Sequence, residues 1–219
     1  MWFLYNMNKK ILLLDLSYGI SLDMFYNLLL KLSPGAGDKK FSRKYDEIQK
    51  IIKNISHSRI SKKLGKVYSL ILDAEKISHN KNTDDIHFHE VGRDEAIILS
   101  ASIILAIEEL NIEKIICTDL IDGSGFIDCS HGRIKVPVPA VLNLAAKNDL
   151  KIAIDDKVYT EMLTPMALSI LIASNAKFSS EEYEKALREI TPLKEATQKG
   201  SRQIKENRGV LGILGILNS

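Results

Sequence analysis

Hydrophobic and polar positions along the chain follow two patterns, short continuous apolar runs and longer stripes at helical spacing. The clearest run is residues 11–16 (ILLLDL), which the polar turn 17–19 follows. A run that is apolar at almost every position is typical of a strand buried on both faces, as in a parallel sheet. The same reasoning predicts further strands at 86–89, 112–118, 151–154 and 209–217.

The longer stripes predict helices, because their apolar residues recur every three or four positions. Ser21 and Thr164 are suitable N-terminal caps, and Pro139 and Pro165 suit a first helical turn. Residues 95–110 are apolar on nearly every side, which predicts a buried central helix. The predicted helices cover residues 21–32, 42–55, 60–78, 95–110, 139–147, 164–173 and 181–189.

Strands that alternate with helices indicate an α/β fold, and we expect a mixed or mostly parallel sheet flanked by helices. A hairpin is predicted at 126–136, around Ser130-His-Gly132. A chain of 219 residues is long enough to bury a proper core and is compatible with one domain. We therefore assign residues 1–219 to a single α/β domain in which residues 1–9 are a disordered extension.

Composition narrows the function classes. Thirty basic residues against 28 acidic ones give a net charge of +2. This charge is too small to indicate a nucleic-acid-binding protein. The chain has no apolar run of the roughly 18 residues that a membrane span needs, and its start is too short for a signal peptide. Cys117 and Cys129 form no CxxC pair, which favours free thiols and a cytoplasmic location.

Two aspartates and a glycine turn follow the first predicted strand. Asp15 ends the strand, Gly19 lies in the turn and Asp23 lies in the first turn of the helix. Backbone amides at such a loop, together with Ser17 and Ser21, suit an anion. Two carboxylates would repel a bare phosphate, and a bridging metal would remove that conflict. The alternative is that Asp15 caps the turn and Asp23 stabilises the helix dipole, and the spacing leaves both open.

The second group of polar residues is His87-Phe-His89-Glu90-Val-Gly92. On a strand, residues two apart face the same side, so His87 and His89 could reach one metal ion, with Glu90 beside them. The alternative is that both imidazoles only form hydrogen bonds with neighbouring loops.

A third group combines two glycine turns with a helix start. Gly123, Ser124 and Gly125 could bring backbone close to a ligand, and His131 could add a nitrogen ligand to a metal. Thr164 stands at the start of a predicted helix and offers a second anion site. Ordinary tight turns are the alternative.

Taken in order, these motifs resemble the N-terminal part of the LarC family of nickel insertion proteins. The opening DLSYGISLDM is similar to the family's first loop, and H-F-H-E-V-G, G-S-G and the C-x-H-G-x-x-x-V-P-x-P-A block are intact. The family's L-T-P-T-G is represented by LTPMA. The quoted segments are residues 15–24, 87–92, 123–125, 129–140 and 163–167.

The resemblance implies an activity. LarC proteins insert nickel into a pyridinium bisthiocarboxylate mononucleotide in a CTP-dependent reaction, which yields the nickel-pincer cofactor of lactate racemase. Such an enzyme is a nickel chelatase, or cyclometallase, of the lyase class. In full-length members a C-terminal domain holds CTP with magnesium or manganese. That domain is absent from this sequence, so we expect a separately encoded C-terminal subunit as partner; homo-oligomerisation stays open.

The resemblance also implies roles for the residues above. Nickel would be held by His87, His89, Glu90 and His131, and Asp15 and Asp23 would be catalytic, meeting a metal or a phosphate. Substrate-binding residues would be Ser17, Gly19, Ser21, Gly123, Ser124, Gly125 and Thr164.

Two other hypotheses belong to different classes. The chain could be a noncatalytic relative that binds a metal or nucleotide or scaffolds a partner, because Leu22 stands where the family has glycine. A metal-dependent hydrolase using Asp15 and Asp23 is the third hypothesis, although such sites carry a denser set of carboxylates.

Overall fold

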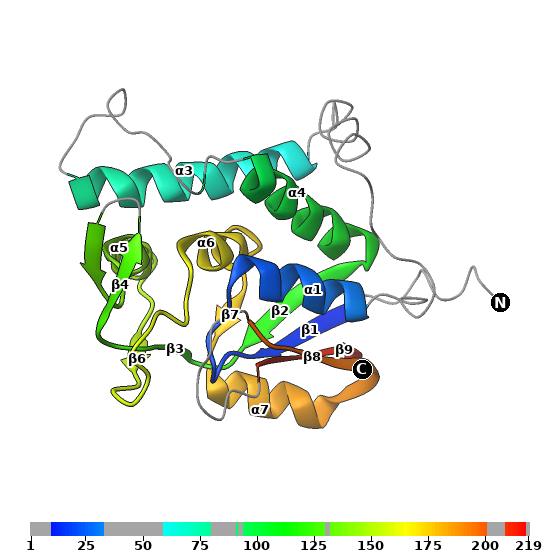
Figure 1. Cartoon of the computed structure of the whole chain (residues 1–219). Helices are drawn as coiled ribbons and strands as arrows, with labels where there is room; N and C mark the ends of the chain where they lie inside the picture. Colours follow the sequence, from blue (N-terminus) through cyan, green and yellow to red (C-terminus); the bar gives the residue numbers. More distant parts are fainter. Residues whose placement is uncertain are drawn as a thin grey trace.

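A five-stranded sheet forms the centre of the computed structural model (Figure 1), with the strand order β7-β2-β1-β9-β8. The structure describes residues 10–32, 59–79, 91, 94–129, 132–200 and 209–217. The extension at 1–9, the helix at 42–55 and the strand at 86–89, all predicted above, lie outside the described residues. The five strands are β1 (Lys10–Asp15), β2 (Ile112–Cys117), β7 (Lys177–Phe178), β8 (Ile190–Gln198) and β9 (Val210–Leu217).

The sheet is mixed, as predicted. Strand β1 pairs in parallel with β2, and β2 pairs in parallel with β7. Strand β9 runs antiparallel to both of its neighbours, β1 and β8. The parallel half carries the strand-to-helix loops at its carboxyl end, which is where ligands bind in open α/β sheets.

Helices cover both faces of this sheet (Figure 1). Helices α1 (Leu22–Leu32) and α4 (Asp94–Glu109) lie on one face, and α7 (Ser180–Glu189) lies on the other. The long helix α3 (Arg59–His79) packs against α5 (Pro139–Lys147) and α6 (Pro165–Ala173). Within the described residues, no helix is both long enough and apolar enough to cross a membrane.

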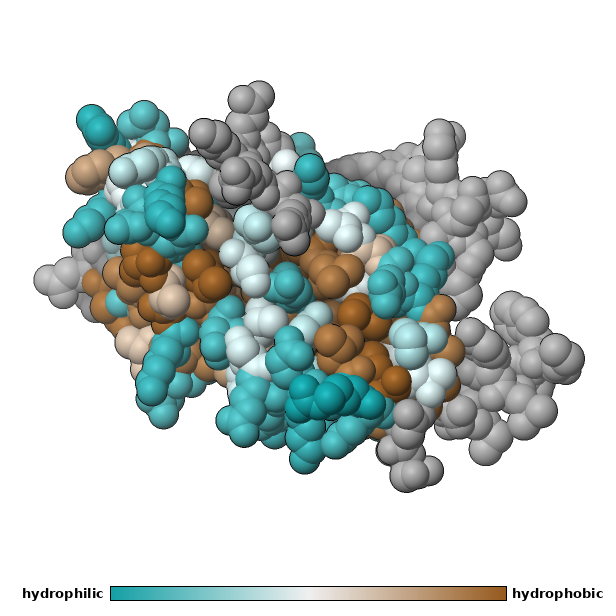
Figure 2. Space-filling model, turned by 90° about the horizontal axis from the view of Figure 1, so that it is seen from below, coloured by the Kyte–Doolittle hydropathy of each residue, from teal (hydrophilic) through white to brown (hydrophobic). Residues whose placement is uncertain are grey.

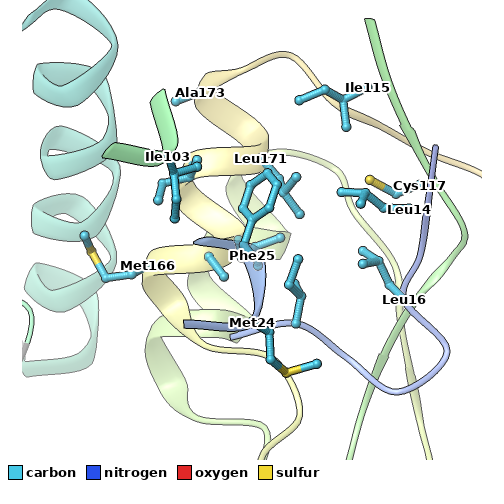
Figure 3. Close-up of a cluster of buried hydrophobic side chains, with 14 of the residues drawn as sticks. Leu14, Leu16, Met24, Phe25, Ile103, Ile115, Cys117, Met166, Leu171 and Ala173 are labelled. Carbon is cyan, nitrogen blue, oxygen red and sulfur yellow. The ribbon is translucent and has the colours of Figure 1, made fainter. Parts of the chain in front are cut away.

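Strand β1 explains why its sequence is apolar at consecutive positions. Leu12 and Leu14 belong to the larger core, where Leu14 lies near Phe25 of α1 (Figure 3), whereas Ile11 and Leu13 pack on the α7 side. All four leucine and isoleucine side chains are buried. Because successive side chains of a strand point to opposite faces, two covered faces require an unbroken apolar run.

Helix α4 is less buried than its sequence predicted. Ile103, Ile104 and Ile107 are buried, but Leu99 and Leu105 are only partly so. The helix packs against α1, α3, α6 and β2, while Leu99 and Leu105 keep part of their surface exposed. An apolar composition therefore overstated its burial, since apolar side chains also occupy partly exposed positions.

Two small sheets lie beside the main one. Strands β3 (Leu120–Asp122) and β6 (Ile152–Ile154) pair in parallel, and β4 (Phe126–Cys129) with β5 (Gly132–Lys135) forms the predicted hairpin. Phe126 and Ile154 are about half exposed. Seen from below (Figure 2), a band of polar and pale-coloured side chains separates two hydrophobic areas, and the left one lies on the side of β4 and β6.

We expect Leu14→Ala to lower the free energy of unfolding by about 2–5 kcal/mol, because it leaves a cavity between β1 and α1. The matched control is Leu142→Ala in α5, where the side chain is 48% exposed and a change well below 1 kcal/mol is expected. Urea unfolding followed by circular dichroism measures both. Equal losses in the two variants would contradict the placement of Leu14 in the core.

Candidate functional site

Two loops meet at the backbone of Met162, in the segment that precedes α6. The first is the turn after β1, in which the N–H of Gly19 donates to the carbonyl of Leu16 at 2.8 Å. Gly19 has a φ of 70°, and a Cβ atom built on it would lie 2.2 Å from the carbonyl oxygen of Met162. Only glycine fits this position, because both the conformation and the close approach exclude a side chain.

The same contact places two helix starts side by side. Ile20 forms an isolated parallel bridge with Leu163, and the N–H of Thr164 donates to the carbonyl of Ile20 at 3.2 Å. Helix α1 begins two residues after Ile20, and α6 begins immediately after Thr164. The free N–H groups of both first turns therefore lie at one end of the molecule, where they favour negative charge.

The second loop follows β3 and contains Asp122, which is fully buried. One carboxylate oxygen of Asp122, Oδ1, accepts from the N–H groups of Gly123, Met162 and Leu163 at 2.8, 2.7 and 3.2 Å. Asp122 is not among the functional residues that the sequence motifs predicted. The signal that could have singled it out is an acid at the end of a strand directly before glycine.

The glycines of the G-S-G turn are explained by packing against residues 158–160. A Cβ atom on Gly123 would lie 2.1 Å from the carbonyl oxygen of Thr160, and Gly125, with a φ of 82°, lies beside Tyr159. The N–H and hydroxyl of Ser124 both reach the carbonyl of Val158, at 2.7 and 3.3 Å. The turn thus brings its polar groups to the neighbouring backbone, and its role toward a substrate stays a prediction.

The two aspartates of the first loop each accept a hydrogen bond from a serine hydroxyl. The Asp15 carboxylate accepts from the N–H and the hydroxyl of Ser17 at 2.9 and 2.5 Å. The Asp23 carboxylate accepts from the hydroxyl of Ser21 at 2.5 Å. These contacts match the turn-capping alternative for Asp15. They also leave acceptor capacity on both carboxylates, since each carboxylate has about four lone-pair sites.

The surroundings of Asp15 include a buried phenol. Burial raises the pKa of Tyr183 to about 12, and the negative charge of Asp15 adds to this effect.

In the part of the chain that the structure describes, no three histidine, cysteine, aspartate or glutamate side chains are grouped to hold a metal ion.

Thr164 is the N-terminal cap residue of α6 and has extended backbone angles, with φ −99° and ψ 145°. Its hydroxyl oxygen is buried and has no hydrogen-bond partner among the described residues. Because buried polar atoms almost always have a partner, this hydroxyl is suited to a ligand or a water molecule.

The four predicted nickel ligands, His87, His89, Glu90 and His131, lie outside the described residues. Val91, which directly follows Glu90, is described: its side chain packs against the larger core. The hydroxyl of Tyr68 on α3 donates to the carbonyl of Val91 at 3.0 Å, and burial raises the pKa of Tyr68 to about 12.

The fold and these loops define an open α/β protein whose strand-to-helix loops gather around two adjacent helix starts. The model of the nickel insertion protein family matches residues 35–214. The chain therefore belongs to the nickel insertion protein family, and the resemblance seen in its motifs is confirmed.

Curated relatives of the chain are also named nickel insertion proteins. The chain is similar to the pyridinium-3,5-bisthiocarboxylic acid mononucleotide nickel insertion protein of Acetivibrio thermocellus, with 39% identity over 62% of this chain and 33% of the relative. The protein of that name from Alkaliphilus metalliredigens is 34% identical over 64% of this chain and 34% of the relative. The matched part of the chain spans about a third of the length of these curated relatives. No solved structure matches the chain.

We expect Gly19→Ala to lower the free energy of unfolding by at least about 2 kcal/mol, because the new methyl group would strike the carbonyl of Met162. Gly65→Ala on α3 is the matched control. No atom lies within 4 Å of its added Cβ, so alanine should stabilise the helix by about 0.5–1 kcal/mol. Chemical denaturation of both variants tests the packing of the Gly19 turn, and a harmless Gly19→Ala would refute it.

Tyr68→Phe should cost about 1 kcal/mol at neutral pH, because the hydrogen bond to Val91 is lost. The folded protein keeps the phenol protonated up to about pH 12, whereas the unfolded chain loses the proton near its ordinary pKa of 10. The stability that Tyr68 contributes is therefore full below about pH 10 and is lost as the pH rises through about 12. Urea unfolding at increasing pH should show the difference from wild type shrinking. A constant difference would contradict this, and exposed Tyr159→Phe is the control.

Proposed function

We propose that this chain takes part in inserting nickel into pyridinium-3,5-bisthiocarboxylic acid mononucleotide. The observation that carries the proposal is the match to the nickel insertion family over residues 35–214. Relatives at 33–39% identity are named for this substrate. The product would be the nickel-pincer cofactor, and the activity would be that of a lyase-class nickel chelatase.

The two adjacent helix starts are the proposed site for the phosphate of the mononucleotide. Helices α1 and α6 both begin where Ile20 and Leu163 are bridged. The hydroxyl of Thr164 is the proposed donor to a phosphate oxygen in this region. The hydroxyls of Ser17 and Ser21 donate to Asp15 and Asp23 in this structure, and we propose that they exchange those bonds for bonds to the phosphate. The unpartnered hydroxyl of Thr164 supports a ligand at the start of α6.

Asp15 and Asp23 add negative charge to this region, so we propose that a divalent cation joins them to the phosphate. Carboxylate and phosphate oxygens are the ligands that magnesium and manganese prefer. The serine hydroxyl that each carboxylate accepts leaves other lone pairs for such a cation. Without the cation, bringing phosphate beside two carboxylates would be unfavourable.

Nickel is a substrate in this proposal, and His87, His89, Glu90 and His131 are its proposed ligands. Imidazole with a carboxylate suits nickel better than magnesium. Ligating imidazoles must be deprotonated, so nickel should bind more weakly near pH 5. Tyr68 and the core packing of Val91 anchor the chain directly after Glu90.

CTP, with magnesium or manganese, is proposed to bind a portion of the family protein other than the domain described above. We propose that a separately encoded subunit supplies that portion. About two thirds of the length of the relatives lies outside the segment matched here.

The direct test is nickel insertion into the mononucleotide, with CTP and with the remaining two thirds of the Acetivibrio thermocellus relative supplied as a separate chain. We expect product only with both chains present. A His87→Ala/His89→Ala double variant should lose nickel binding in calorimetry by at least about tenfold, which corresponds to about 1.4 kcal/mol.

His57→Ala and His79→Ala are the controls, because neither residue lies in a motif. If the double variant binds nickel as tightly as wild type, the metal site lies elsewhere. If nickel binds but no product forms with the second chain, the chain is a noncatalytic member of its family.

A further inference from the structure

Asp122 is a buried carboxyl group that hydrogen-bonds to Met162 and Leu163, the two residues before Thr164 of the proposed phosphate site. Its side chain has an exposed fraction of 0%. Burying a carboxylate is strongly unfavourable unless hydrogen bonds compensate for the lost water. The three backbone N–H groups that donate to Oδ1 provide part of that compensation.

The three donors come from two distant parts of the chain. Gly123 belongs to the loop of Asp122 itself, whereas Met162 and Leu163 lie about 40 residues away. A carboxylate that only capped its own turn would need the first contact alone. The other two fasten the segment before α6 to the end of β3, and hydrogen bonds to a charged acceptor are about twice as strong as neutral ones.

That segment in turn sets both parts of the phosphate site. The carbonyl of Met162 lies against the Gly19 turn, and Leu163 is bridged to Ile20. The next residue is Thr164, whose N–H donates to the carbonyl of Ile20. Each of these groups is separated from an N–H held by Asp122 by no more than one residue, so a shift of residues 162–163 would move them together.

We infer that Asp122 is a positioning residue, which holds the Gly19 turn and the start of α6 in the arrangement proposed to bind the phosphate. The inference rests on the proposed function for the ligand, but the positioning itself concerns only this chain. Asp122 is buried and acts through residues 162–163, so it is not a catalytic residue.

The test compares two substitutions. Asp122→Asn keeps an oxygen that can accept from the same N–H groups, and Asp122→Ala removes it. We expect Asp122→Ala to weaken binding of the mononucleotide, measured by calorimetry with magnesium, by at least about tenfold, and Asp122→Asn to restore most of that loss. In the nitrogen–proton spectrum of the protein without ligand, Asp122→Ala should shift the amide signals of Gly19 and Thr164.

Ile116→Ala is the control for lost stability, because Ile116 is buried in the cluster on the α7 side of the sheet. It should lower the unfolding free energy without changing mononucleotide affinity or the Gly19 and Thr164 signals. An equal loss of affinity in Ile116→Ala would overturn the inference, and so would a folded Asp122→Ala that binds like wild type.

Two further outcomes are decided by the spectra. If Asp122→Ala does not fold, Asp122→Ser carries the test, because its hydroxyl ends one atom short of the carboxylate oxygen that Met162 and Leu163 donate to. Shifts of the Gly19 and Thr164 amide signals in this variant support the inference, and unchanged Gly19 and Thr164 signals overturn it. If wild type binds neither the mononucleotide nor inorganic phosphate, the proposed phosphate site is wrong, while the same amide signals still decide whether Asp122 positions the two loops.

Discussion

The peptide backbone at Met162 is held from two sides, and the arrangement of the candidate site depends on it. Its N–H is bound by the buried carboxylate of Asp122, and its carbonyl lies directly against Gly19. Backbone can pack on backbone this closely only where one partner has no side chain. Gly19 therefore leaves room for the carbonyl of Met162, and Asp122 accepts the hydrogen bond of its N–H group.

This constraint has an electrostatic consequence. Because residues 20 and 163 are bridged, the first turns of α1 and α6 lie together, and their unbonded N–H groups form a region of partial positive charge. Asp23 in the first turn of α1 and Asp15 before it offset that charge with two carboxylates. The helix starts favour an anion, and the two carboxylates favour a cation. The region is therefore best suited to a ligand that carries both, such as a metal-bound phosphate.

Much of the fold could be predicted from local pattern. The unbroken apolar run at 11–16 indicated a strand covered on both faces, and Pro139 and Pro165 marked the starts of α5 and α6. Strand β8 was missed because it is an edge strand. Among the described strands it pairs only with β9, it contains Pro192, and most of its polar residues are exposed. Its sequence therefore lacks the apolar signal that buried strands carry.

The candidate site was harder to predict, because its organising contacts join distant residues. Gly19, Ser21 and Thr164 could be singled out from loops at predicted helix starts, but nothing in the sequence pairs residue 20 with residue 163. Asp122 looked like an ordinary turn residue, since two of its three donors are far away in sequence. The predicted ligands His87, His89, Glu90 and His131 lie outside the described residues and stay predictions.

Close packing against two further glycines also fixes α1. A Cβ atom on Gly212 of β9 would lie 2.7 Å from a methyl group of Leu28, and one on Gly200 would lie 2.9 Å from the sulfur of Met24. Both glycines let neighbouring backbone approach the helix closely. The contact of Gly200 with Met24 and the bridge at Ile20 thus hold the start of α1, and the contact of Gly212 with Leu28 holds its middle. A helix start held in this way on two sides can present its N–H groups in one orientation before a ligand arrives, which lowers the entropy lost on binding.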